Sequence, residues 1–255
     1  MSELILPTER HKIKEQNPRI LIVFGRPKSG KTTLLSMLDN NLIIDLEHGT
    51  DQIESMSIEA NNLNDLRNIR QAVINAGKPY RYITIDNITK LEDLAVNLAL
   101  INYRKTPMGV NFGLNPQTGV YDNVDIRTLP NGAAYLYIRL AFDAILSSFE
   151  GLSKYLILIA HTKDKTINRN GKDLSENSID LSGKLERITA ANADAIGYLY
   201  REGNQNYLNF NGGGDFIVEA RAKHLRGQNI LLAESDDNGD ITAYWDKIYK
   251  NYDND

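Results

Sequence analysis

Apolar residues occur along the chain in five short runs, separated by segments in which they recur at helical spacing. The runs are rich in Ile, Leu and Val, as in strands that are buried on both faces of a sheet. They are RILIVF with its core at 20–24, NLIID at 41–45, YITID at 82–86, YLILIA at 155–160 and AIGYLY at 195–200. Helices are expected between them, at about 31–39, 64–76, 91–103, 134–149 and 183–192. This alternation predicts an α/β fold with a mostly parallel central sheet flanked by helices.

The helix expected at 134–149 carries one broad apolar stripe that we predict to face the core. Its members are Leu136, Leu140, Ile145, Leu146 and Phe149.

Two segments interrupt the alternation, and a third suggests a turn. Residues 104–133 are rich in Gly, Pro and Asn and lack periodicity, so we expect a functional or mobile insertion. Residues 163–180 are polar and follow a strand directly, so we expect a loop. Near the C-terminus, YLNF, NGGG and DFIVEA predict a β-hairpin with a glycine turn. We therefore expect one domain at 20–250, preceded by an N-terminal arm at 1–19 and followed by an acidic tail at 251–255.

The composition limits the cellular compartments and the binding partners that we expect for this protein. The formal net charge of -4 gives no global attraction to nucleic acid, so any such contact must come from local basic loops. The absence of cysteine excludes disulfides and thiolate metal sites and fits a reducing cytosol. No apolar run approaches the roughly 20 residues that cross a bilayer, and the polar start MSELILPTERHKIKEQ does not resemble a signal peptide. We expect a cytoplasmic protein without a membrane partner.

The segment between the first strand and the first helix matches G-x-x-x-x-G-K-[ST]. Gly25 and Gly30 let the backbone curl so that N–H groups point at phosphate oxygens, at the positive end of the following helix. Lys31 can reach the β- and γ-phosphates of ATP, and Thr32 can offer its hydroxyl to Mg²⁺. A glycine-rich turn with incidental basic residues is the alternative. The nucleotide contacts expected along this loop are Gly25, Arg26, Pro27, Lys28, Ser29, Gly30, Lys31, Thr32 and Thr33.

ATP hydrolysis also needs a carboxylate that organises Mg²⁺ and a group that activates water. Asp86 ends the strand at 82–86 as such a metal-organising carboxylate does, although it could instead cap the next helix. Many P-loop ATPases have a glutamate next, but this chain has Asn87, so the base must lie elsewhere. Glu47 follows the second strand, where open α/β sheets collect ligands, and is either the base or an ordinary loop carboxylate. His161 ends the fourth strand and is either a γ-phosphate sensor or a polar residue bonded to a loop carbonyl.

These segments together resemble the RecA-like P-loop ATPases, and most closely the small phage relatives of RecA known as AAA-type ATP-binding or single-strand annealing ATPases. The resemblance covers roughly residues 18–232. It rests on GRPKSGKTTLL, LIIDLEHGTD, YITIDNITKLEDL, YLILIAHTKDK, LERITAANADAIGYLYREGN and VEARAKHLRGQN. RecA-like enzymes place their catalytic base after the second strand, which favours Glu47. The resemblance also implies that the strand of His161 lies between the P-loop strand and the Asp86 strand, although RecA itself has glutamine in place of His161.

The resemblance further implies a basic pair that reaches into the ATP site of a neighbouring subunit, and Lys223 and Arg226 match it. Such a pair would stabilise charge on the transferring phosphoryl group. The alternative is a solvated, charged strand end.

The loop after His161 corresponds to a segment that touches single-stranded DNA in RecA. Its basic residues are Lys163, Lys165, Arg169 and Lys172, among Asn, Ser and Gly, and it has no aromatic residue for stacking on bases. A solvated mobile loop is the alternative.

We therefore expect a Mg²⁺-dependent, DNA-stimulated ATPase that acts on single-stranded DNA in phage-type recombination or replication, in the host cytoplasm if a phage encodes it. The short arm before the first strand favours a ring, a short filament or a monomer that assembles on DNA, with a recombination or replication protein as a further partner. A nucleotide-switched assembly or loading module with slow hydrolysis and a protein target is the alternative. A small-molecule phosphotransferase is weaker, because such kinases usually have an arginine-rich lid, whereas residues 104–133 contain only Arg104 and Arg127.

Overall fold

The structure is a computed structural model that describes residue 8 and residues 15–169, 172–212 and 217–250, with the backbone alone at 165–169 and 172–176. Most of the expected N-terminal arm and the whole acidic tail at 251–255 lie outside the described residues. The strands are β1 (Ile20–Gly25), β2 (Asn41–Asp45), β3 (Ser57–Glu59), β4 (Tyr82–Asp86), β5 (Tyr155–Arg169), β6 (Lys172–Ile179), β7 (Ala195–Glu202), β8 (Gln205–Asn209), β9 (Glu219–Ala220), β10 (Asn229–Ser235) and β11 (Ile241–Ala243). The helices are α1 (Lys31–Ser36), α2 (Leu63–Asn75), α3 (Ile88–Arg104), α4 (Ala134–Phe149) and α5 (Leu185–Asn192), with short 3₁₀ helices η1 (Ile126–Thr128), η2 (Pro130–Gly132) and η3 (Trp245–Lys247).

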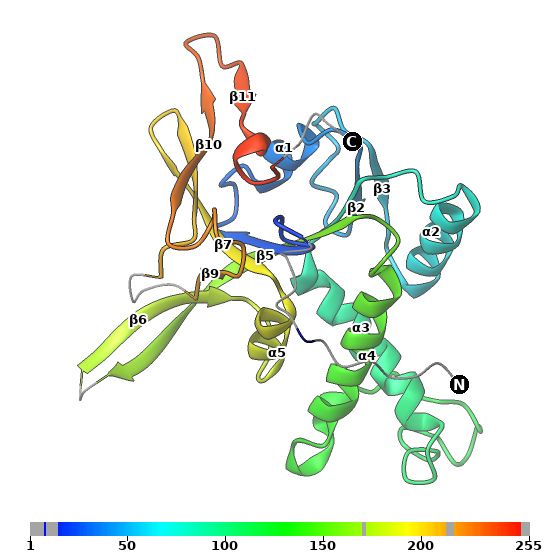
Figure 1. The fold of residues 1–255 in the computed structure, drawn as a ribbon. Helices are drawn as coiled ribbons and strands as arrows, with labels where there is room; N and C mark the ends of the chain where they lie inside the picture. The colour runs from blue at the N-terminus through cyan, green and yellow to red at the C-terminus, as the bar shows by residue number, and fades with distance from the viewer. Residues whose placement is uncertain (1–7, 9–14, 170–171, 213–216, 251–255) are drawn as a thin grey trace.

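One mixed sheet organises the fold, with the strand order β11-β10-β8-β7-β1-β5-β4-β2-β3 (Figure 1). The strands from β7 to β3 run parallel, so their carboxyl ends share one edge. In register, Gly25 lies beside His161 and Asp45 beside Asp86. Strands β8, β10 and β11 extend the sheet beyond β7 in antiparallel pairs. The topology confirms the predicted α/β class and places β5 between β1 and β4, as expected.

The central strands are apolar throughout because both faces of the sheet are covered. In β1, Ile22 and Phe24 join a hydrophobic cluster with α2, α3, α4 and α5, whereas Leu21 and Val23 join a second cluster on the other face. This three-layer arrangement positions the polar residues that follow each strand along the carboxyl edge.

The second face is covered by α1 and by the C-terminal segment. Trp245 Nε1 donates to Leu34 O at 2.8 Å. The Tyr249 ring lies 4.8 Å, between ring centroids, from each of Tyr82 and Tyr155. The helix after the phosphate loop is therefore held between the sheet and the end of the described chain.

The expected loop at 163–180 is instead a β-hairpin. β5 continues to Arg169 and pairs antiparallel with β6, from Thr162 opposite Ile179 to Arg169 opposite Lys172. The prediction failed because this part of the strand lacks an apolar run, although the Asn170-Gly171 dipeptide is the strongest short hairpin signal.

The predicted pairing of YLNF with DFIVEA is also wrong, although a C-terminal hairpin is present. β8 pairs with β7 and β10, and β9 pairs with β7, so the described residues of the two segments do not pair with one another. The C-terminal hairpin is formed by β10 and β11.

Helix α4 has its predicted bounds, and the C-terminal half of its predicted stripe is correct, because Ile145 and Phe149 are buried and Leu146 packs against the core. The N-terminal half of the stripe is wrong. Leu136 and Leu140 are 47% and 56% exposed, while Ile138, Ala141 and Phe142 are buried with the rest of the inward face. A one-residue change in phase along an apolar helix moves the buried stripe by about 100°. The helix is apolar on more than one side, so periodicity did not fix its phase.

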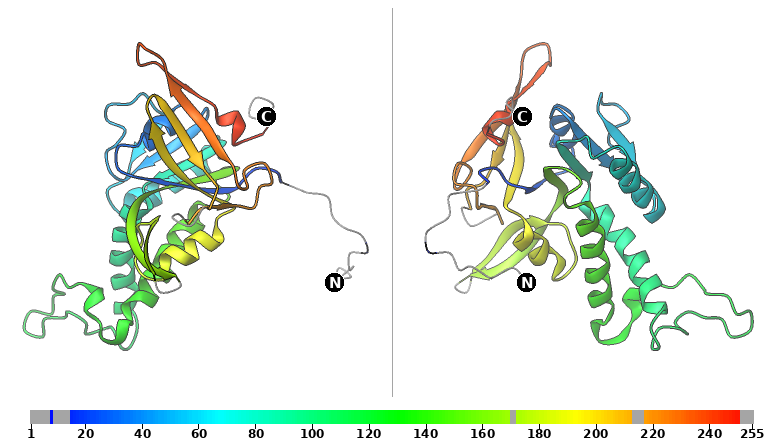
Figure 2. Two further views of the ribbon diagram at one scale, coloured as in Figure 1. Left: turned by 90° about the vertical axis from the view of Figure 1, so that its left-hand side faces the viewer. Right: turned by 45° about the vertical axis from the view of Figure 1, so that its right-hand side comes forward.

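The 104–133 segment contains η1, η2 and a single β-bridge between Leu114 and Tyr121. It projects from the end of the α3–α4 pair that points away from the sheet (Figure 2). Within the described part of the chain, helices long and apolar enough to cross a membrane are absent.

Candidate active site

The phosphate loop joins β1 to α1 and is built by close backbone approaches. A Cβ added to Gly25 would lie 2.5 Å from the carbonyl oxygen of Leu199, and Gly30 has a φ of 90°. Neither position tolerates a side chain without strain. The Ser29 hydroxyl is buried and has no hydrogen-bond partner among the described residues. A buried hydroxyl in a curled, glycine-rich loop fits a ligand that carries hydrogen-bond acceptors.

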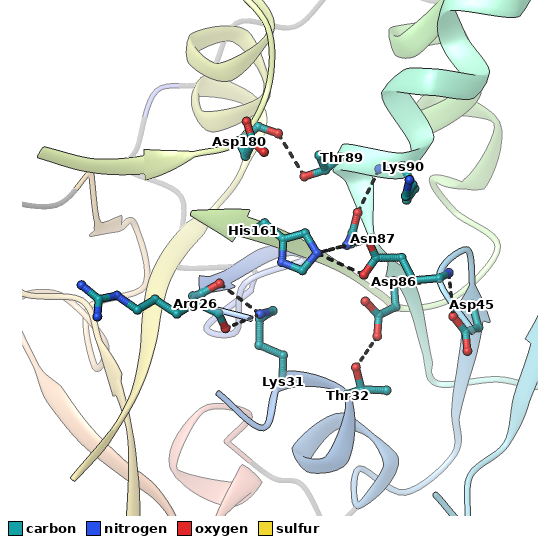
Figure 3. Close-up of polar contacts among 12 residues, drawn as sticks. Arg26, Lys31, Thr32, Asp45, Asp86, Asn87, Thr89, Lys90, His161 and Asp180 are labelled. Atoms are coloured by element: carbon teal, nitrogen blue, oxygen red, sulfur yellow. Dashed lines mark hydrogen bonds and ion pairs between the residues drawn. The ribbon is translucent and has the colours of Figure 1, made fainter. Parts of the chain in front are cut away.

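Lys31 lies inside this loop rather than in solvent. It is 7% exposed, and its Nζ donates to Gly25 O at 3.0 Å and Arg26 O at 2.9 Å (Figure 3). Burial lowers the pKa of Lys31, while the negative charges of Asp86 and Glu47 act in the opposite direction. The ammonium group is thus held inside the curled backbone of the loop, a position that suits phosphate binding.

Asp86 and Thr32 form the part of the site that suits a divalent cation. Thr32 Oγ1 donates to Asp86 Oδ2 at 2.5 Å, and Asp86 is 4% exposed. The pKa of Asp86 is raised to about 6, chiefly by burial and also by the nearby charges of Asp45 and Glu47, while the Thr32 hydrogen bond and Lys31 act in the opposite direction. A buried carboxylate beside a hydroxyl and other carboxylates fits Mg²⁺, which prefers oxygen ligands.

Glu47 lies in a loop that Asp45 holds in place. Asp45 is fully buried, and its carboxylate accepts from Glu47 N–H at 2.9 Å, Thr50 N–H at 2.8 Å and Thr50 Oγ1 at 2.7 Å. The loop backbone is therefore fixed from beneath, while the Glu47 side chain remains 28% exposed. A rigid loop with an accessible carboxylate suits a general base.

His161 connects Glu47 to the start of α3. Its Nε2 lies 3.1 Å from both carboxylate oxygens of Glu47 and 2.9 Å from Asn87 Nδ2. Asn87 Oδ1 caps α3 by accepting from Lys90 N–H, so the Asn87 amide group must face the imidazole with its nitrogen. Nε2 carries either a proton for Glu47 or a lone pair for Asn87. The imidazole can therefore stabilise only one of these two partners at a time.

Of the basic residues of the hairpin, the structure describes the side chain of Lys163 alone. Lys163 Nζ donates to Leu181 O and lies 3.5 Å from Glu186 Oε2, so it holds the base of the hairpin against the start of α5. The side chains of Lys165, Arg169 and Lys172 lie outside the described residues.

Lys223 and Arg226 lie at the other end of the sheet. Arg221, in the same turn, donates its N–H to Asp194 O, and Asp194 bonds in turn to Ile20, the first residue of β1. β1 has six residues, so this end is about 20 Å from the phosphate loop. Arg226 donates to the carbonyls of Ala220 and Arg221, whereas Lys223 is exposed and lines a cavity of about 740 Å³ with His224 and Lys250. The structure does not bring this pair to its own ATP site.

Two residues of the site are absent from the sequence-based prediction. The sequence marks Asn87 only as a departure from the usual glutamate, but Asn87 contacts His161 and caps α3. Asn206 in β8 is 6% exposed and donates from Nδ2 to Ser29 O in the phosphate loop at 3.1 Å. A polar residue directly after Asp86 is a signal for the first. The second is joined to its partner across 177 residues and leaves no local signal.

Comparison with known proteins gives a family. A family model described as an AAA domain matches residues 17–221. The curated proteins contain no match to this sequence. Similar solved structures include the RadB recombinase, with 11% identity, a TM-score of 0.47, and coverage of 89% of this chain and 92% of that one. Two others each cover 89% of both chains: the KaiC-like protein PH0186 from Pyrococcus horikoshii OT3, with 14% identity and a TM-score of 0.43, and the flagellar accessory protein FlaH from Methanocaldococcus jannaschii, with 12% and 0.40.

Proposed function

The chain belongs to the AAA domain family and has a RecA-like P-loop ATPase fold, and from this premise we propose that it hydrolyses ATP with Mg²⁺ and couples the reaction to single-stranded DNA. The observation that carries the proposal is the convergence of Lys31, Thr32, Asp86, Glu47 and His161 at one edge of the sheet. Lys31 and Thr32 begin α1, Glu47 follows β2, and Asp86 ends β4. His161 is the last residue of β5 that pairs with β1. Together these residues suit each role that hydrolysis requires.

The residues divide the chemistry among them. Loop N–H groups and Lys31 hold the phosphates, and Thr32 with Asp86 would hold Mg²⁺, which supplies charge neutralisation when bound. The oxygen of a water molecule attacks the γ-phosphorus while Glu47 takes a proton from that water. The bond from that phosphorus to the β–γ bridging oxygen breaks, and ADP and phosphate leave. His161 lies beside Glu47, where it can respond to the γ-phosphate.

The DNA part of the proposal is supported by the connection between this site and the β5–β6 hairpin. His161 is the residue of β5 at which the strand leaves the parallel sheet and enters the hairpin. Thr89 Oγ1 in α3 donates to Asp180 O at the end of β6 at 3.0 Å. Any shift of His161 relative to Asn87 would therefore be transmitted to the base of the hairpin. The four basic residues of the hairpin suit a phosphate backbone, although acidic residues alternate with them in the sequence.

ATPase activity titrated with single-stranded DNA, double-stranded DNA and RNA at controlled salt tests this proposal. We expect turnover that rises with single-stranded DNA and a DNA affinity that falls with salt. Turnover indifferent to every nucleic acid, without salt-sensitive binding, would remove DNA from the proposal and leave the ATPase.

A nucleotide-switched assembly module with slow turnover is the second candidate, and one contact favours it. Both oxygens of Glu47 lie against His161, so the base is already engaged by a side chain. Light scattering with and without a non-hydrolysable ATP analogue separates the two functions. A nucleotide-triggered complex with a protein but not with DNA would favour the switch.

A further inference from the structure

Three tyrosines form a ladder on the antiparallel extension of the sheet. The ring centroids of Tyr198 and Tyr200 are 6.0 Å apart with an interplanar angle of 15°, and those of Tyr200 and Tyr207 are 5.5 Å apart at 19°. The ring centroid of Phe24 in β1 lies 5.3 Å from that of Tyr198, which forms the inner end of the ladder. The ladder therefore begins in the core and ends with two nearly parallel, half-buried rings on β7 and β8.

The rings share one face of the extension because of the strand pairing. Tyr200 lies directly opposite Tyr207 in the β7–β8 pair, and Leu231 of β10 lies opposite Tyr207 on the other side. Side chains alternate between faces along a strand, so the neighbours Leu199 and Leu208 are buried on the opposite face. The tyrosine face is thus the side of the extension that does not pack against the phosphate loop.

The polar groups around the rings are mainly amides. Asn229 Nδ2 donates to the Tyr200 hydroxyl at 2.7 Å, and the Tyr207 hydroxyl donates to Gln205 Oε1 at 2.6 Å. Asn209 shares the face, and the acidic Glu202 lies at its end. Stacked rings with amide neighbours suit nucleobases, which offer planar faces and hydrogen-bonding edges, better than they suit phosphates.

This face complements the hairpin. The β5–β6 hairpin has four basic and three acidic residues and no aromatic residue. The residues of β7 and β8 that share the tyrosine face include rings and amides but no basic residue. Both leave the central sheet on the same side of the molecule, the hairpin on one side of β7 and the β8–β10 strands on the other (Figures 1 and 2). A single strand needs both a cationic track and stacking surfaces.

The face is also joined directly to the ATP site. Asn206 and Tyr207 are consecutive in β8 and so point to opposite faces. Asn206 contacts Ser29 O of the phosphate loop, and Tyr207 ends the ladder.

We propose that the face formed by Tyr200 and Tyr207 is a base-stacking surface for single-stranded DNA. The inference rests on the proposed DNA function and names the surface that contacts the bases. The hairpin supplies the phosphate contacts.

Two substitutions in the full chain test it. Tyr207→Leu keeps an apolar side chain but removes the ring, and it should weaken binding of fluorescent oligodeoxythymidylate by about 5- to 150-fold, the range for one stacked base. Tyr207→Phe keeps the ring and should bind like the unmodified protein. The slope of affinity against salt should not change, because no phosphate contact is lost.

Two controls distinguish the loss of base stacking from general damage to the protein. Tyr121→Leu, in the distant 104–133 insertion, should leave binding unchanged. An abasic oligonucleotide should bind Tyr207→Leu and the unmodified protein equally. Equal thymidylate affinity for Tyr207→Leu and the unmodified protein would overturn the proposal, as would an equal loss with the abasic strand.

Crosslinking of the unmodified protein to an oligonucleotide with 5-iodouracil keeps the test valid if Tyr207→Leu fails to fold. Crosslinks should map to Tyr200 or Tyr207. Crosslinks confined to other segments would overturn the stacking surface while leaving DNA binding intact. If the unmodified protein binds no single-stranded DNA, the proposed DNA function itself fails.

Discussion

Lys31 and Glu47 lie on different elements and have different roles in the proposed reaction. Lys31 is enclosed by the phosphate loop and contacts its carbonyls, whereas Glu47 extends from the loop after β2 toward His161. In the proposed reaction, one side chain contributes to holding ATP and the other to the reaction of water. Substitutions at the two positions should give different kinetic signatures.

Glu47→Gln should leave ATP affinity nearly unchanged and lower turnover by about 10²- to 10⁴-fold, because the amide cannot accept the proton. Lys31→Ala should weaken binding itself, by about 10-fold or more, since a charge-assisted hydrogen bond contributes roughly 1.5–3 kcal/mol. Calorimetric titration with ATP and a phosphate-release assay on the same preparations measure both quantities. Equal and mild losses of turnover in the two variants would mean that Glu47 is not the base.

Asn206→Ala removes the one hydrogen bond by which a strand outside the parallel core reaches the Ser29 carbonyl. The variant should keep its fold, because β8 retains its backbone pairs with β7 and β10. ATP affinity should fall by about 2- to 10-fold, the value of one net hydrogen bond. Asn209→Ala, on the opposite face of the same strand, is the matched control and should bind ATP normally. A loss of affinity in both variants would point to β8 as a whole instead of Asn206.

The β5–β6 hairpin can be shortened without disturbing the sheet. Lys163 and Ser178 lie opposite one another, so an Asn-Gly turn can replace residues 164–177. The shortened protein should bind ATP normally and lose its response to single-stranded DNA. The comparable control replaces residues 115–120 of the insertion at the Leu114–Tyr121 bridge and should keep the response. A DNA response that survives the hairpin deletion would assign DNA binding elsewhere.

At the same scale, the elements show what sequence can and cannot determine. β2 and β4 have their predicted bounds because each is buried on both faces and so forms an uninterrupted apolar run. The outer half of β5 has no such run, and its strand conformation comes from pairing with β6. Leu140 is exposed because the sheet and α3 pack against other sides of α4. The position of those elements cannot be derived from the periodicity of α4 alone.

In the candidate site, too, some residues could be predicted from the sequence and others could not. The residues of the phosphate loop could be named from sequence because they form one local motif. Glu47, Asp86 and His161 could be named because each lies at or just after the end of a predicted strand. Asn206 reaches the loop only because β8 folds back along β7. Contacts of this kind are set by the topology of the sheet and not by neighbouring residues.

For the whole molecule, the two ends of the parallel sheet differ in chemistry. The carboxyl edge carries the candidate ATP site, and the amino edge carries the exposed Lys223. A lysine that acts on phosphate from there must act on another molecule. A head-to-tail contact between such unlike surfaces is heterologous and produces rings or filaments.

Mixing two inactive variants tests whether Lys223 acts across such a contact. Lys223→Ala has an intact base and lacks the cation, and Glu47→Gln has the cation and lacks the base, so each alone should hydrolyse ATP slowly. In an equimolar mixture, a site from the first can lie beside Lys223 of the second. Random assembly gives that arrangement at about one quarter of the interfaces, so turnover should recover to about one quarter of the unmodified rate. The phosphate-release rate should rise with total protein concentration, because the active site exists only in the assembly. Mixing either variant with Lys31→Ala,Lys223→Ala, which supplies neither a working site nor the cation, is the control and should restore nothing. A mixture no faster than the mean of its components would show that Lys223 does not complete a neighbour's site.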